Sequence, residues 1–104
     1  MTDLLKEKDI QREVVALYHA IGAHTYSTSV YRPGGARIEA GIPDLIVLHP
    51  KLGVWFHETK RPKSKQSDEQ ILFQTRCAQA GVVYVLGGVE EARAALIFAG
   101  ILDD

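Results

Sequence analysis

The chain has 104 residues, enough for one domain, and its hydrophobic fraction of 46% excludes an intrinsically disordered protein. A net charge of −1 excludes broad, non-specific attraction to nucleic acid, although acids gathered at a metal site would leave a nucleic-acid enzyme possible. A single cysteine, Cys77, excludes an internal disulfide, and the absence of a signal peptide or a membrane-length apolar run predicts a soluble intracellular protein without a membrane partner.

The first element expected is a helix over about residues 3–21. Its apolar residues recur at spacings of three and four and form one stripe, which comprises Ile10, Val14, Leu17, Tyr18 and Ile21. Thr2 or Asp3 can cap its start, and Gly22 is well placed to end it. Glu13 lies beside the stripe, where it is either a boundary glutamate that reaches solvent or a carboxylate that faces the sheet.

A strand rich in Thr, Ser, Tyr and Val follows over about residues 24–31. The residues after it form a turn or loop, because a proline and two glycines occupy positions 33–35. Arg32 and Arg37 bracket this turn. The loop therefore either lies along a phosphate backbone or is a solvated hairpin tip.

Two apolar segments joined by a short turn predict a hairpin, with strands over about residues 42–48 and 54–60. Alternate side chains of the second strand share a face, so Glu58 and Lys60 lie on the same side. Because its apolar residues come first and the charged pair comes last, we expect the charged pair at the rim of the sheet. His57 points away from Glu58 and is expected to be structural.

A basic connection and a second helix come next. The connection places four cations in six positions, namely Lys60, Arg61, Lys63 and Lys65, and is a candidate contact for phosphate. Ser67 is expected to cap a helix that ends near residue 80. The residues expected to face the sheet are Ile71, Leu72, Thr75, Ala78 and Gln79. An apolar strand over residues 82–86, suited to the middle of a sheet, and a helix over 89–99 complete the chain.

The order of expected elements is helix, three strands, helix, strand, helix, or αβββαβα. Short connections favour antiparallel pairing of the first strands. The strand–helix–strand step near the end predicts a parallel pair. We therefore expect an α/β fold in which residues 1–104 form a single domain, with a small mixed sheet flanked by helices.

The acidic residues of this hairpin predict a chemistry. Asp44 begins the first strand, and the hairpin would bring it close to Glu58 and Lys60. Two carboxylates about 4 Å apart near a surface repel each other by roughly 4 kcal/mol, and a divalent cation removes that repulsion. Oxygen ligands favour Mg²⁺ or Mn²⁺, and a lysine beside them could orient a water or offset charge on a phosphate. The alternative is an ordinary surface salt bridge between Glu58 and Lys60.

These residues carry a resemblance. Pro43-Asp44 and Glu58-Thr59-Lys60 are similar to the motif of PD-(D/E)xK nucleases, and Gly41 fits the same pattern. The chain most resembles the single-domain, virus-type VRR-NUC family from about residue 10 to residue 99. Glu13 matches the acid of that family's first helix. The segment 67–70, which ends in Gln70, matches the family's serine-to-glutamine segment at the start of the next helix.

The resemblance implies a restriction-endonuclease-like core and a structure-selective DNA endonuclease. Glu13, Asp44, Glu58 and the Thr59 carbonyl would hold Mg²⁺ or Mn²⁺. Lys60 would serve the attacking water, and Gln70 would support the site. It also implies a homodimer that resolves four-way (Holliday) junctions in the cytoplasm of a bacterial or phage-infected cell, because a two-fold dimer presents two sites to two symmetric strands.

Two alternatives stay open. The first is a nuclease of the same fold that cuts flaps or duplex DNA. The second is a module that binds DNA or protein without cutting it, which the basic segment and the apolar C-terminus would suit. Converging acids argue against the second alternative, because they repel the phosphates of a nucleic acid.

Overall fold

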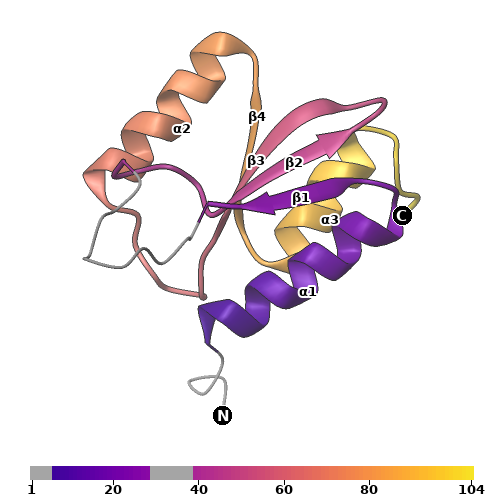
Figure 1. Cartoon of the computed structure of the whole chain (residues 1–104), viewed down its shortest axis with the longest axis horizontal. Coiled ribbons are helices and arrows are strands. Elements are labelled where there is room, and N and C mark those ends of the chain that lie inside the picture. The colour runs from indigo at the N-terminus through magenta and orange to yellow at the C-terminus, as the bar shows by residue number, and fades with distance from the viewer. Residues whose placement is uncertain (1–5, 29–38) are drawn as a thin grey trace.

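A computed structural model describes residues 6–28 and 39–104 of the chain and has the expected element order (Figure 1). The helices are α1 (Glu7–Ala20), α2 (Asp68–Ala80) and α3 (Val89–Phe98). The strands are β1 (His24–Ser27), β2 (Leu45–His49), β3 (Gly53–Thr59) and β4 (Val83–Gly87). The loop prediction for Arg32 and Arg37 falls outside the described residues. The expected start of the first helix near residue 3, with a cap at Thr2 or Asp3, was wrong, because Lys6 is extended and Glu7 is the first helical residue.

The four strands form one mixed sheet in the order β1-β2-β3-β4. The pairs β1–β2 and β2–β3 are antiparallel, and β3–β4 is parallel, as expected. The prediction that the apolar segment 82–86 would lie in the middle of the sheet was wrong, because β4 is an edge strand. It is apolar because α2 and α3 both contact it, so helices rather than neighbouring strands cover it.

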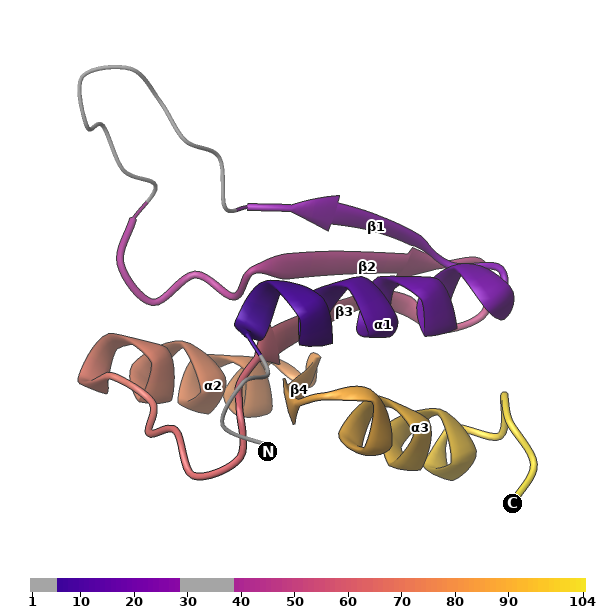
Figure 2. The ribbon, with the colours of Figure 1, turned by 90° about the horizontal axis from the view of Figure 1, so that it is seen from below.

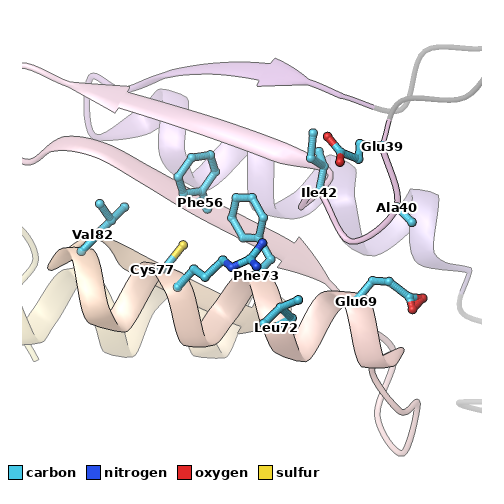
Figure 3. Close-up of a pocket in the computed structure, with 11 residues that line it drawn as sticks. Glu39, Ala40, Ile42, Phe56, Glu69, Leu72, Phe73, Cys77 and Val82 are labelled. Atoms are coloured by element: carbon cyan, nitrogen blue, oxygen red, sulfur yellow. The ribbon is translucent and has the colours of Figure 1, made fainter.

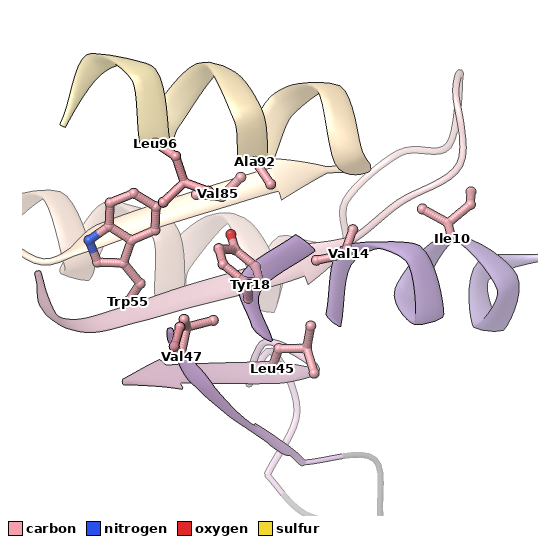
Figure 4. Packing of buried hydrophobic residues seen from close by; sticks show 10 residues of the cluster. Ile10, Val14, Tyr18, Leu45, Val47, Trp55, Val85, Ala92 and Leu96 are labelled. Carbon is pink, nitrogen blue, oxygen red and sulfur yellow. The ribbon is translucent and has the colours of Figure 1, made fainter. Parts of the chain in front are cut away.

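The main core lies between one face of the sheet and the helices α1 and α3 (Figures 2 and 4). The predicted stripe of α1 supplies buried Ile10, Val14 and Tyr18, so the helical periodicity read from the sequence is confirmed. The sheet and α3 supply the remaining core residues, which are Leu45, Val47, Trp55, Val85, Ala92 and Leu96, together with Ala23 from the α1–β1 turn. The edge of Tyr18 meets Trp55, with ring centroids 6.4 Å apart.

Helix α2 packs on the opposite face of the sheet. Phe73 contacts Phe56 of β3 and Tyr84 of β4, with ring centroids 5.1 Å and 6.3 Å away. The expected sheet-facing side of this helix was wrong, since Ile71 and Leu72 are 47% and 48% exposed. The error arose because the true inner side includes the polar residue Gln70, which faces Glu58 rather than the apolar core.

The apolar residues at the end of the chain divide between the core and the surface. Ile101 and Leu102 pack against the core, and both of their backbone N–H groups donate to the carbonyl of Leu96. Phe98 is instead 94% exposed and leaves an apolar side chain at the surface. Within the described ranges, none of the helices has the length and apolar character needed to cross a bilayer.

Candidate active site

Asp44 and Glu58 meet at the rim of the sheet on the side that α2 covers. Leu45 pairs with His57 across the antiparallel strands, so the same register continued by one position sets Asp44 opposite Glu58. The backbone N–H of Thr59 donates to Asp44 Oδ1 over 2.9 Å and fixes this carboxylate. The hairpin therefore brings together the two acids that the sequence indicated.

Gln70 joins Glu58 to the start of α2. Its Nε2 donates to Glu58 Oε2 over 2.9 Å, while its Oε1 accepts a hydrogen bond from the backbone N–H of Ser67 over 2.9 Å. The Ser67 hydroxyl in turn accepts from the backbone N–H of Gln70 and completes a capping box. Because Ser67 binds the oxygen of the amide, the nitrogen is directed at the carboxylate. The same contacts that begin the helix thus orient Gln70.

The position of Asp44 disfavours the ionisation of Glu58. Burial, followed by repulsion from Asp44, raises the pKa of Glu58 to about 7, and the charge of Lys60 lowers it only in part. Burial also raises the pKa of Asp44, against hydrogen bonds from Thr59 and from the backbone N–H of Asp44 that lower it. A pair that consists of a buried and a half-buried carboxylate binds a proton or a cation in preference to carrying two free negative charges.

Lys60 directly follows β3 and is half-buried. Its backbone N–H donates to the carbonyl of Gly87 over 3.3 Å, so the main chain at this position is tied to the end of β4. The simple salt bridge between Glu58 and Lys60 does not form. Within residues 6–28 and 39–104, the ion pair with a nitrogen–oxygen distance below 4.0 Å joins Arg12 to Asp9. The Lys60 charge acts on Glu58 from a longer distance.

Glu13 is not grouped with the other two acids. Its side chain is exposed and lines a cavity of about 540 Å³ shared with Lys60 and Arg61. In the described part of the chain, no cluster of three or more acidic, His or Cys side chains is arranged to hold one metal ion. The α1 acid whose charge raises the pKa of both Asp44 and Glu58 is instead Glu7. Nothing in the sequence pattern distinguished Glu7 from the other charged residues around it.

His57 is structural, as expected from its face of β3. The side chain is fully buried, and its Nε2 lies 3.0 Å from the carbonyl oxygen of Gly87. A carbonyl only accepts, so Nε2 carries the proton and Nδ1 accepts from the Tyr18 hydroxyl over 2.8 Å. Burial lowers the pKa of His57 and keeps the ring neutral. Since Gly87 also receives the Lys60 N–H, this network fixes the strand ends that carry the site.

The remaining predicted residues lie around this pair. Arg61, Lys63 and Lys65 are exposed along the connection from β3 to α2. The Thr59 side chain is fully buried. Its hydroxyl lowers the pKa of Asp44, although it makes no hydrogen bond within the described residues. The Thr59 carbonyl stays a predicted ligand.

A comparison with solved structures now identifies the architecture. A chain described as a VRR_NUC domain matches with a TM-score of 0.68 and 24% sequence identity, covering 88% of this chain and 94% of that one. This chain has the VRR_NUC fold. The expected restriction-endonuclease-like α/β architecture is thereby confirmed. No family model and no curated protein matches the sequence.

The sheet brings Asp44, which precedes β2, and Glu58 of β3 to one rim. The parallel pairing of β3 with β4 and the hydrogen bond from the Lys60 N–H to Gly87 hold the main chain of Lys60 there. The oxygen atoms available are hard ligands of the kind that Mg²⁺ and Mn²⁺ prefer. Burial and repulsion raise the pKa of Glu58, and a bound cation would lower it again.

Proposed function

We propose that the protein is a metal-dependent endonuclease that hydrolyses phosphodiester bonds in DNA. The observation that carries the proposal is the Asp44–Glu58 pair, in which the half-buried Asp44 raises the pKa of the buried Glu58, with Lys60 two residues beyond Glu58. The pair stands in a VRR_NUC fold. A protein that only bound DNA would gain nothing from acids at this position, because they repel phosphate.

Mg²⁺ or Mn²⁺ would be held by Asp44, Glu58 and the Thr59 carbonyl, with Glu13 as the further acid that the family resemblance implies. When bound, such a cation supplies positive charge beside the phosphate and makes a neighbouring water more acidic. The protein's own groups do the rest. Lys60 orients the attacking water or offsets charge that develops on the phosphate, and Gln70 holds Glu58 in place.

We further propose that the substrate is a four-way junction and that the acting form is a homodimer. A two-fold dimer directs two equal sites at two symmetric strands, which suits paired incisions. The basic residues Arg61, Lys63 and Lys65, with Arg32 and Arg37 from the loop prediction, would contact the DNA backbone. Such an enzyme would act inside the cell, in a bacterial or phage-infected cytoplasm. A nuclease selective for flaps or duplex ends is the second candidate.

Cleavage assays on labelled DNA test these proposals. Matched linear duplex, flap and four-way junction are incubated with and without Mg²⁺ or Mn²⁺, and the oligomeric state is measured by sedimentation. We expect metal-dependent incision, fastest on the junction, by a dimer. Equal rates on all three DNAs would refute junction selectivity, and a monomer would refute the paired-incision mechanism.

Two substitutions test the residue roles. Asp44→Ala and Lys60→Ala are expected to abolish cleavage, whereas Asp103→Ala at the exposed C-terminus serves as the control. Asp44→Ala should not destabilise the metal-free protein through charge, because it relieves the repulsion on Glu58. Full activity in either of the two site variants, with the fold verified by circular dichroism, would remove the catalytic assignment.

A further inference from the structure

A cavity of about 590 Å³ opens between α2 and the sheet, and the proposed mechanism does not use it (Figure 3). Its walls are largely apolar and include Phe56, Leu72, Phe73 and Val82. Three charged residues also line it, namely Glu39, Glu69 and Arg76. This volume lies within the range of small-molecule binding sites and is open to solvent along α2, where Leu72 is 48% exposed.

Two elements, β3 and α2, carry residues of both the cavity and the site. Phe56 lies two residues before Glu58 on the same face of β3, about 7 Å away along the strand. On α2, Phe73 lies three residues after Gln70 and so faces the same way. A group bound at Asp44 and Glu58 is therefore within one nucleotide's reach of the phenyl rings.

The two flanks of the carboxylate pair differ in their lining. On one flank, the cavity of about 540 Å³ that lies towards α1 and α3 is lined by charges of both signs, with Lys60 and Arg61 beside Glu13, Glu90 and Glu91. The α2 cavity instead has two phenyl rings, those of Phe56 and Phe73, in its apolar walls. The uncharged aromatic ring of a nucleotide therefore matches the α2 cavity better than it matches the other flank.

We propose that the α2 cavity binds one unpaired nucleobase of the DNA strand whose phosphate lies at Asp44 and Glu58. This inference rests on the proposed nuclease function. Phe73 and Phe56 give the ring an apolar wall, and the Arg76 guanidinium can stack on it or donate hydrogen bonds to its edge. A base inside a duplex is stacked on its neighbours and does not reach the cavity, so the site selects a nucleotide that is already unpaired or is drawn out of the helix.

The experiment removes the base and not the phosphate. The nucleotides on either side of the mapped cut, or of the branch point if no cut occurs, are replaced one at a time by an abasic analogue in otherwise identical DNA. We expect the abasic DNA on one side to be cleaved and bound about 10-fold less well, which equals about 1.4 kcal/mol. Phe73→Leu and Arg76→Ala should each reduce this discrimination to below about threefold, whereas Phe98→Ala, which removes an exposed phenyl ring on α3, should leave it unchanged.

Two readouts separate this inference from the function on which it rests. Binding of both DNAs is measured without metal by fluorescence anisotropy, so it does not depend on cleavage. Cleavage with equal rates for natural and abasic DNA would overturn the cavity proposal and leave the nuclease intact. Base-dependent binding without any cleavage would support the cavity and refute the nuclease. Discrimination retained in both cavity variants, with folding verified by circular dichroism, would also overturn the proposal.

Discussion

Ser67 and Gln70 allow helix capping to be separated from catalysis. Each supplies one half of the capping box at the start of α2, but only Gln70 also donates to Glu58. Removing a cap costs about 1 kcal/mol, so Ser67→Ala should lower the free energy of unfolding by an amount of that order, and Gln70→Ala should lower it by more because it also loses the hydrogen bond to Glu58. Ser67→Ala keeps the backbone N–H that holds the Gln70 amide oxygen, and the amide nitrogen therefore still faces Glu58.

Activity should distinguish the two variants. A hydrogen bond to a charged group contributes about 1.5–3 kcal/mol, so loss of the Gln70 donor predicts a fall in cleavage rate of at least about 10-fold. Ser67→Ala should stay within about threefold of the native rate at a temperature where both variants are folded. Urea unfolding gives the stabilities, and initial cleavage rates at saturating Mg²⁺ give the activities. Equal activities for the two alanine variants would refute the role given to the Gln70 amide.

Two further predictions concern the rim of the sheet. Gly41 has a φ of +91°, and a Cβ added there would lie 2.5 Å from the backbone oxygen of Glu69, so Gly41→Ala should destabilise the protein by roughly 2 kcal/mol or more in urea unfolding. Gly53→Ala, with a φ of +75° and no atom within 4 Å of the added Cβ, should lower the free energy of unfolding by only about 1 kcal/mol. Equal losses of stability in the two variants would contradict the close contact between Gly41 and Glu69 of α2. Because the folded-state pKa of Glu58 is raised to about 7, the folded metal-free protein binds a proton more readily than the unfolded chain, and this group's stabilisation is lost as pH rises from about 4.5 through 7. Glu58→Gln should therefore flatten the pH dependence of urea unfolding in this window, and an unchanged slope would contradict the assignment.

The sequence predicted those parts of the fold that depend on local pattern. The spacing of apolar residues in α1, the cap at Ser67 and the hairpin that aligns Asp44 with Glu58 are all properties of short segments. These segments place the carboxylate pair at the rim. The fold class followed from the order of such elements and their short connections.

The parts that could not be predicted depend on contacts between distant elements. The inner side of α2 includes Gln70, whose partner Glu58 lies on another element, so a search for an apolar stripe selected the wrong side. The edge position of β4 depends on which faces the helices cover. Glu7 raises the pKa of Asp44 and Glu58 through its charge, and this effect depends on how α1 packs against the sheet rather than on any pattern in the residues around Glu7.

The sheet divides the protein into two halves with different tolerance to motion. All ten residues of the main buried cluster lie on the side of α1 and α3 or in the strands and turn they cover, and α2 contributes none of them. Helix α2 rests mainly on an aromatic contact and on its polar link to Glu58. It can therefore shift or partly unfold at a lower free-energy cost than α1 or α3, while the rest of the protein keeps its shape. A ligand that displaces α2 outward would enlarge the cavity between α2 and the sheet without unfolding the main core.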